Sequence, residues 1–153
     1  MKIRSYQSKD CTEIIELFYN TVHFVNSKDY NDRQINVWAP KNISKIKWDK
    51  SLLEHYSVVV EENGIIIGFG DLGSYGYFDR LYVHKDYQGI GVGKTILNEI
   101  EKYAYENGVK VIVTHASITA KSFFYKFGYK VIKEQSVERY GESLNNFVME
   151  KTL

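Results

Sequence analysis

The sequence predicts an α+β domain with helices on both faces of one mixed, mostly antiparallel β-sheet, that is, three α/β/α layers. Three observations carry this prediction. Segments with apolar residues at helical spacing are interspersed with short β-branched runs. An Asn-Gly pair separates two of these runs, and a glycine-rich segment joins a strand to a helix in the middle of the chain. About seven strands and three or four helices are expected, with a central βαβ unit.

Length and composition are typical of a soluble single domain. The chain has 153 residues, of which 44% are hydrophobic and 25% charged, and its net charge is +1. We therefore expect one domain over residues 1–153, located in the cytoplasm, with no charge excess to attract nucleic acid or a membrane surface. The first residues lack the apolar core of a secretory signal, and no apolar run approaches about 20 residues. The single Cys11 excludes an intramolecular disulfide framework.

The N-terminal third begins with a strand and continues with helices. Residues 2–6 alternate as a short strand, and Ser8 or Asp10 can cap the helix that follows. Apolar residues recur at helical spacing in that helix: Ile14, Leu17, Phe18, Val22 and Val25. A second, weaker helix can continue until Pro40, and the polar segment 41–50 is ambiguous.

The residue pattern in the middle of the chain predicts strands and then a helix. Residues 57–60 and 65–69 are β-branched runs on either side of Asn63-Gly64, a dipeptide that favours a type I′ hairpin turn. Residues 77–83 form another strand, which leads into a glycine cluster at 88–93. The helical period then returns with Ile96, Leu97, Ile100 and Ala104.

The last third alternates between strand and helix. The helix after the glycine cluster ends at Gly108, which fits a C′ position. Residues 109–114 predict a strand, residues 120–127 a helix and residues 129–138 a further strand. Residues 146–151 are expected to close the sheet at its edge, and such an edge could pair with a second copy of the chain in a homodimer.

Three glycines stand at alternate positions between strand and helix, at Gly89, Gly91 and Gly93. Glycine adopts positive φ and lets a ligand approach the backbone, while the first N–H groups of a helix favour an anion. The segment therefore predicts a binding site for a phosphate or pyrophosphate group. It is not a Walker A loop, because Gln88 occupies the first glycine position, and it is not a dinucleotide fingerprint, because Lys94 occupies the third.

The pattern Gln-x-x-Gly-x-Gly at residues 88–93 resembles the GNAT superfamily of acyl-CoA-dependent N-acetyltransferases. A second anchor of that family, Ala-x-x-aromatic-Tyr-x-x-x-Gly-Phe, is similar to residues 120–129, which read AKSFFYKFGY. The order of predicted strands and helices also matches along the whole chain. The resemblance thus implies a single-domain GNAT-like fold.

The resemblance implies acetyl-CoA as co-substrate. In that family the loop amides hold the pyrophosphate, and the backbone of the preceding strand pairs with the pantetheine arm as an added strand does. Ser117 lies where many relatives have an Asn that touches CoA, although a plain helix cap accounts for it equally well. The implied cofactor-binding residues are Leu81, Tyr82, Val83, Gln88, Gly89, Ile90, Gly91, Val92, Gly93, Lys94, Ser117 and Phe124.

The implied reaction is direct attack of an amine on the acetyl thioester, and the protonated amine must first lose a proton to a base. Relatives often place a carboxylate where this chain has Tyr77, and Asp79 lies two residues along on the same strand face. Asp79 is therefore the expected base. A salt bridge to Arg80 is its structural alternative, and His84 is a third candidate for the base.

The leaving thiolate raises a second question, because the family's usual acid, a Tyr four residues before the helix-ending glycine, is Phe124 here. Tyr125 lies about 100° further round the helix and is the expected substitute, unless it is simply an exposed aromatic. The four histidines show no metal spacing, so no metal is expected. Acceptor-side residues are expected from the first two helices and the strand: His23, Tyr30, Trp38 and Tyr77.

These expectations favour an acetyl-CoA-dependent N-acetyltransferase that acts on a small-molecule amine. Two alternatives stay open: a non-catalytic acyl-CoA sensor, because the acid position is Phe124, and a protein or peptide N-acetyltransferase. The near-neutral charge gives no sign of a strongly cationic protein target. The identity of the acceptor, and whether its nitrogen or oxygen is acylated, do not follow from these residues.

Overall fold

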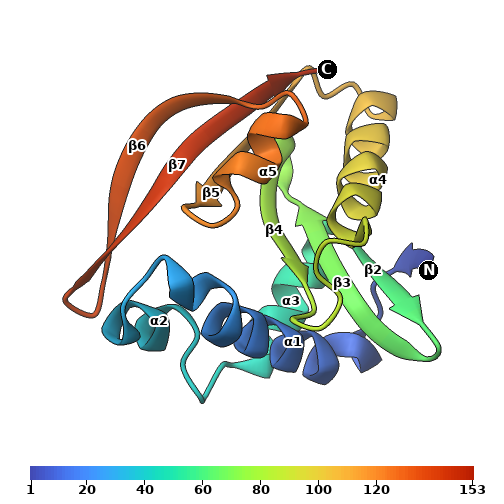
Figure 1. Ribbon diagram of the computed structural model, residues 1–153. Coiled ribbons are helices and arrows are strands. Elements are labelled where there is room, and N and C mark those ends of the chain that lie inside the picture. The colour runs from blue at the N-terminus through green and yellow to red at the C-terminus, as the bar shows by residue number, and fades with distance from the viewer.

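A seven-stranded sheet forms the centre of the computed structural model, which describes residues 1–153 (Figure 1). Its strands are β1 (Lys2–Ser5), β2 (Tyr56–Glu62), β3 (Ile65–Leu72), β4 (Tyr77–Val83), β5 (Val111–Ser117), β6 (Lys130–Arg139) and β7 (Glu142–Thr152). The helices are α1 (Cys11–Phe24), α2 (Asp32–Trp38), α3 (Lys45–Glu54), α4 (Val92–Glu106) and α5 (Lys121–Lys126). The strand order is β1-β2-β3-β4-β5-β7-β6, in which β4 and β5 are parallel and all other neighbours antiparallel. The predicted α+β sheet with a central βαβ unit is confirmed.

Each face of the sheet carries its own hydrophobic core. Helices α4 and α5 cover one face, where the predicted apolar stripe of α4 is fully buried, including Ile96, Leu97 and Ile100. Helices α1 to α3 cover the other face, where Phe18 and Phe69 are buried. Full burial of such side chains contributes about 1.5–3 kcal/mol each, so the two cores hold the three predicted layers together. None of the helices is both long and apolar enough to cross a lipid bilayer.

The ambiguous segment 41–50 lies partly in α3. Ser44 begins this helix, because its Oγ accepts a hydrogen bond from the Lys47 N–H at 3.3 Å. Leu52 is the one buried residue of α3, and Trp48 packs partly buried against the neighbouring core. The apolar pattern of α3 is therefore weak, and tertiary packing stabilises the helix more than its own sequence does.

The C-terminal hairpin corrects one expectation from the sequence. Residues 146–151 do not form the edge of the sheet, because they belong to β7, which lies between β5 and β6. The turn between β6 and β7 is at Tyr140-Gly141, where both residues have positive φ. The edge strand is β6, most of whose residues are exposed. Alternation within a strand shows which face it buries but not which neighbour it pairs with.

Strands β4 and β5 separate over most of their length. Only Tyr77 and Phe78 of β4 pair with β5, at Val113 and Thr114. The rest of β4 therefore has an unpaired edge on that side. The opening lies next to α5 and to the segment that leads into α4.

Candidate active site

The glycine-rich segment 88–93 connects the end of β4 to the first turn of α4. Gly91 precedes the helix with φ of 94°, a left-handed conformation that strains a residue with a side chain. No side chain caps this 15-residue helix, so its first N–H groups are available to a ligand. A Cβ added at Gly93 would lie 3.1 Å from the Phe123 ring, so glycine lets α4 approach α5 closely. The segment has the geometry of an anion-binding site.

A cavity of about 410 Å³, here called the loop cavity, lies beside this segment where β4 and β5 separate. Nearly all of the residues predicted to bind the cofactor line it: Leu81, Tyr82, Val83, Gln88, Gly89, Gly91, Val92, Gly93, Lys94, Ser117 and Phe124. Ile90 is the exception, because it does not line the cavity and is 53% exposed. Lys94 adds a positive charge beside the helix N-terminus, and Phe123 and Phe127 add an apolar wall.

The unpaired edge of β4 offers backbone groups to the loop cavity. His84 donates its N–H to β3 at 2.9 Å, so by alternation Leu81 and Val83 turn their backbone groups away from β3 and toward the opening. The Val83 C=O is occupied, because it accepts hydrogen bonds from Thr21 Oγ1 and Gln88 Nε2, both at 2.8 Å. The Leu81 N–H and C=O and the Val83 N–H are the groups left for a ligand.

A second cavity, of about 680 Å³ and here called the aromatic cavity, adjoins the first. Its walls include seven aromatic side chains: Phe18, Tyr30, Trp38, Trp48, Tyr77, Tyr82 and Tyr140. The two cavities share five lining residues: Trp38, Asp79, Tyr82, His115 and Ser117. Asp79 is the one carboxylate among them, so it lies where the contents of the two cavities would meet.

A β-bulge places Asp79 at this junction. Asp71 of β3 pairs with Arg80, and the next residue of β3 pairs with Phe78, so Asp79 is the extra residue on β4. Tyr77 and Asp79 line the aromatic cavity together, as their spacing predicted. The bulge also brings Arg80 to that side of the sheet, where regular alternation would have sent it to the opposite face.

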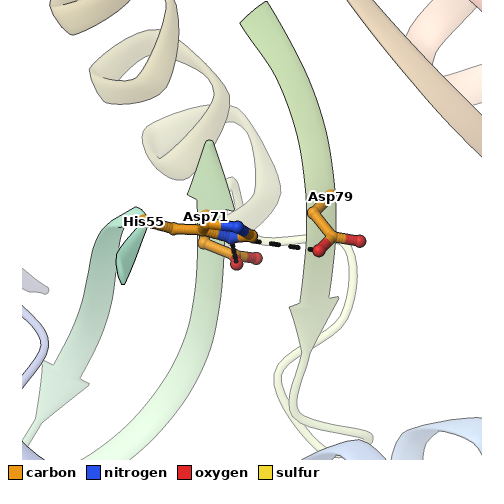
Figure 2. Close-up of side chains that lie close together, drawn as sticks. All are labelled: His55, Asp71 and Asp79. Atoms are coloured by element: carbon orange, nitrogen blue, oxygen red, sulfur yellow. Dashed lines mark hydrogen bonds and ion pairs between the residues drawn. The ribbon is translucent and has the colours of Figure 1, made fainter. Parts of the chain in front are cut away.

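Asp79 lies beside a buried ion-pair network. The fully buried Asp71 carboxylate accepts hydrogen bonds from Arg80 Nη2 and Nε at 2.6 and 3.0 Å and from His55 Nδ1 at 2.7 Å. Arg80 also donates to Ser51 Oγ of α3 at 2.8 Å. Figure 2 shows His55 and Asp71 next to Asp79, and the Asp79 Oδ2 lies 3.9 Å from His55 Nδ1. The same oxygen lies 3.9 Å from Arg80 Nη2.

These surroundings raise the pKa of Asp79 above that of an ordinary aspartate. Burial is the main cause and the Asp71 charge adds to it, whereas Arg80 and His55 act in the opposite direction. The hydrogen bond to Asp71 raises the pKa of His55, although burial of the ring opposes this. A carboxylate with a raised pKa in a cavity is suited to accept a proton from a substrate.

Three side chains of this network, His55, Asp71 and Asp79, offer ligand atoms within 4.8 Å of one another, a spacing that could hold a metal ion. Arg80 already supplies a positive charge there and makes two hydrogen bonds to the Asp71 carboxylate. Since the guanidinium takes up both oxygens of Asp71, the donor set fits an ion-pair network better than a metal centre.

Two further predicted residues lie away from both cavities. Tyr125 lines neither and is 70% exposed, because one helix step of about 100° turns it away from the buried Phe124. His23 also lines neither, since its Nε2 hydrogen bonds to the Ala39 C=O at 2.8 Å and its ring stacks on Tyr19. The placement of Tyr125 gives no support to its expected role as acid, and that of His23 gives none to acceptor binding, so neither residue enters the proposed function.

The other predicted acceptor-side residues and Ser117 line one or both cavities. Tyr30, Trp38 and Tyr77 line the aromatic cavity. The Tyr30 hydroxyl is held in place, because it donates to the Asn145 C=O at 2.7 Å. Ser117 lies in the shared wall, and its Oγ also accepts a hydrogen bond from the Ala120 N–H at 3.0 Å. The capping and cavity-lining interpretations of Ser117 are therefore compatible.

Several cavity residues were not predicted from the sequence. His115 lies in the shared wall, and its position two residues before Ser117 on one strand could have indicated it. Asn146 lines the aromatic cavity, and its buried Oδ1 accepts no hydrogen bond from the protein. Lys47 and Arg139 reach the cavity from α3 and β6, and no local pattern marks them.

Comparison with known sequences agrees with this geometry. Residues 26–153 match the family model of the acetyltransferase (GNAT) domain. The uncharacterized N-acetyltransferase YafP of Escherichia coli strain K12 is 32% identical over 97% of this chain and 94% of its own length. The L-amino acid N-acyltransferase MnaT of the same strain is 31% identical over 74% of this chain and 68% of its own length.

Solved structures extend the comparison to the fold. A GCN5-related N-acetyltransferase from Rhodopseudomonas palustris superposes with a TM-score of 0.96 at 30% identity, over 99% of this chain and 95% of that one. The PaiA N-acetyltransferase of Thermoplasma acidophilum, in complex with coenzyme A, shares the fold with a TM-score of 0.81 at 23% identity, over 99% and 98%. The chain thus belongs to the GNAT family of N-acetyltransferases, which are acyltransferase enzymes.

Proposed function

We propose that this enzyme transfers an acetyl group from acetyl-CoA to the amine of a small-molecule acceptor. The observation that carries the proposal is the meeting of two cavities at one carboxylate, Asp79. A group-transfer enzyme needs a donor site and an acceptor site that bring the reacting atoms together beside a base. A module that only binds acyl-CoA needs neither the second cavity nor the carboxylate.

The loop cavity fits acetyl-CoA, which when bound supplies an activated acetyl thioester. The first N–H groups of α4, at Val92, Gly93 and Lys94, suit its pyrophosphate. The free backbone groups of Leu81 and Val83 suit the amides of its pantetheine arm, which can then lie along β4 as an added strand. Backbone groups that are already in place lose little conformational freedom on binding.

Asp79 is the base in this proposal. An alkylamine with a pKa of about 10.4 is protonated near pH 7, so it must lose a proton before its nitrogen can attack. The raised pKa of Asp79 makes this carboxylate a better proton acceptor than an ordinary aspartate. The bulge on β4 fixes the carboxylate at the junction of the two cavities, where the amine and the thioester would meet.

The leaving thiolate does not require Tyr125. A thiol has a pKa of about 8.5, so its thiolate is a fairly good leaving group near neutral pH. Phe124 packs edge-on against Phe78 and Tyr129 and has no proton to donate. Asp79 is therefore the one catalytic residue of the proposal.

The C-terminal hairpin favours a small acceptor over a peptide. Its tip docks on α2 and the segment before it: Gln34 Nε2 donates to the Ser143 C=O at 2.8 Å, and the Tyr30 hydroxyl donates to the Asn145 C=O at 2.7 Å. Leu144, between these contacts, is buried in the core under α1 to α3. Figure 1 shows the hairpin reaching across to α2. The hairpin thereby forms one wall of the aromatic cavity, and a lysine within a peptide chain, unlike a small amine, would need a groove open at both ends.

Release of free CoA thiol, measured with a library of small amines and with short peptides, tests the proposal. We expect turnover with small amines, and mass spectrometry should find the product acetylated on nitrogen. Acetyl-CoA at 100 times its dissociation constant should also stabilise the protein by about 2.7 kcal/mol. Stabilisation without turnover of any amine would make the chain an acyl-CoA sensor, and turnover of peptides alone would make the acceptor a peptide.

A further inference from the structure

The charges around the aromatic cavity are unbalanced. Three cations line it, Lys47, Arg80 and Arg139, against one carboxylate, Asp79. Arg80 is neutralised by Asp71, to which it makes two hydrogen bonds. Lys47 and Arg139 have no acidic partner within 4.0 Å. The cavity therefore presents two unpaired cations besides its base.

The charges of Arg139 on β6 and Asp79 on β4 both affect the pKa of one side chain, Tyr77. Burial raises the pKa of Tyr77 to about 12, the Asp79 charge adds to this shift, and the Arg139 charge opposes it. All three side chains line the aromatic cavity, so the two opposite charges face the same space. The docking of the hairpin on α2 holds Arg139, the last residue of β6, at this place.

We propose that the acceptor is an α-amino acid with an apolar or aromatic side chain, an inference that rests on the proposed function. Its amine lies at Asp79, its carboxylate is bound by Arg139 with Lys47 nearby, and its side chain packs against the aromatic walls. A guanidinium binds a carboxylate through two parallel hydrogen bonds, which gives orientation as well as affinity. Aromatic walls provide a large apolar contact area for the side chain.

The same charges disfavour a polyamine as the acceptor. A polyamine carries further ammonium groups beyond the one that is acetylated, and these would face Lys47 and Arg139. Like charges placed together in an interface oppose binding. A simple alkylamine lacks this repulsion but leaves both cations without a partner.

The test compares each amino acid with the amine that lacks its carboxylate: phenylalanine with phenethylamine, tyrosine with tyramine, and leucine with isopentylamine, with spermidine added to the panel. We expect kcat/KM to be at least about tenfold higher for the amino acid of each pair, which corresponds to 1.4 kcal/mol. Arg139→Gln and Lys47→Gln should each reduce this preference, mainly by raising KM for the amino acid. Lys133→Gln, an exposed residue of β6 that lines neither cavity, should retain it.

The outcomes separate the acceptor class from the proposed function. Equal or faster turnover of the simple amines or of spermidine would overturn the inference and leave the acetyltransferase proposal intact. A preference for amino acids that survives both substitutions would overturn the assignment of Arg139 and Lys47. If no compound of this panel causes release of free CoA thiol, the inference on the acceptor class fails. If no amine of the wider library causes it either, the proposed acetyltransferase function fails as well. Both side chains are exposed, so unchanged melting temperatures should confirm that the variants fold.

Discussion

Replacing Asp79 by asparagine separates the chemical role of this carboxylate from its effect on stability. Asparagine is nearly isosteric with aspartate, and the side chain is 33% exposed, so the substitution keeps the shape of both cavities. What it removes is the negative charge and the capacity to accept a proton. We expect these losses to lower activity and to leave stability unchanged or increased.

The expected loss of activity follows from the role of a general base. A positioned base contributes about 10²- to 10⁴-fold to the rate, so turnover of Asp79→Asn should fall by a factor in that range. Affinity for acetyl-CoA should change little, because in the proposed complex the loop cavity holds it mainly through backbone groups of segment 88–94 and β4. The remaining turnover should also lose the acid limb of its pH profile, which in the unaltered enzyme reports protonation of Asp79.

The expected gain in stability follows from the sign of the pKa shift. The pKa of Asp79 is raised above its ordinary value of 3.8, first by burial and second by Asp71. The folded protein therefore favours the protonated form, and its free energy of unfolding decreases as pH rises from the unfolded-state pKa through the folded-state pKa. At pH 7 the ionised carboxylate destabilises the fold. Asparagine removes that penalty, so the melting temperature should equal or exceed that of the unaltered protein.

Two other carboxylates serve as controls. Asp71 is fully buried and makes two hydrogen bonds to Arg80, so Asp71→Asn leaves this mostly buried cation with only the Asp79 carboxylate, 3.9 Å away, and should cost about 3–5 kcal/mol. For a chain of this length that lowers the melting temperature by about 6–20 °C. Asp86 lies on the surface with its side chain 65% exposed and lines neither cavity, so Asp86→Asn should alter neither activity nor melting.

Thiol release at saturating acetyl-CoA and thermal melting, both at pH 7, provide the readouts for all three variants. Full activity in Asp79→Asn would remove this residue as the base. A melting temperature well below that of the unaltered protein would show that Asp79 stabilises the fold through His55 and Arg80, contrary to the direction of its pKa shift.

Three further predictions concern the loop, the buried network and the acceptor wall. Acetyl-CoA at 100 times its dissociation constant should raise the melting temperature by about 5–10 °C, and Gly91→Val should abolish this rise. The reason is that φ of 94° is strained for valine, so the loop must change shape. A retained rise would count against this segment as the pyrophosphate-binding site. Because Asp71 raises the pKa of His55, His55→Gln should destabilise the protein most below pH 6.5 and progressively less as pH rises through the folded-state pKa. Urea unfolding of both proteins between pH 5.5 and 8.5 measures this effect. A difference in the free energy of unfolding that stays constant over this range would refute it. Asn146→Leu should leave stability unchanged or higher, because the buried Oδ1 of Asn146 has no hydrogen-bond donor, while KM for the acceptor should rise. If chemical denaturation shows a decrease above about 1 kcal/mol in the free energy of unfolding, Asn146 has a structural role instead.

Features that depend on neighbouring residues could be predicted from the sequence. Asn63 and Gly64 both have positive φ, as their hairpin turn requires. The apolar stripe of α4 is buried, and the glycines before it expose the start of the helix, because periodicity and the backbone freedom of glycine act within a few residues. These local signals were enough to predict the layers, the central βαβ unit and an anion-binding helix start. The cofactor-binding residues followed from the resemblance to the GNAT family, and eleven of the twelve line the loop cavity.

The catalytic and acceptor side of the site depends on contacts between distant segments. His55, Asp71 and Arg80 are brought together by the pairing of β3 with β4 and the packing of α3, and the bulge that aims Asp79 is a shift of register between two strands. Lys47 and Arg139 reach one cavity from α3 and β6.

The sequence by itself thus determined the helix start that can bind an anion, because backbone conformation is set by residues close together in the chain. The tertiary structure decided which side chains surround Asp79 and which residues, such as Tyr125 and His23, are turned away. Strand register and helix packing are set by long-range pairing and burial, and no local pattern records them.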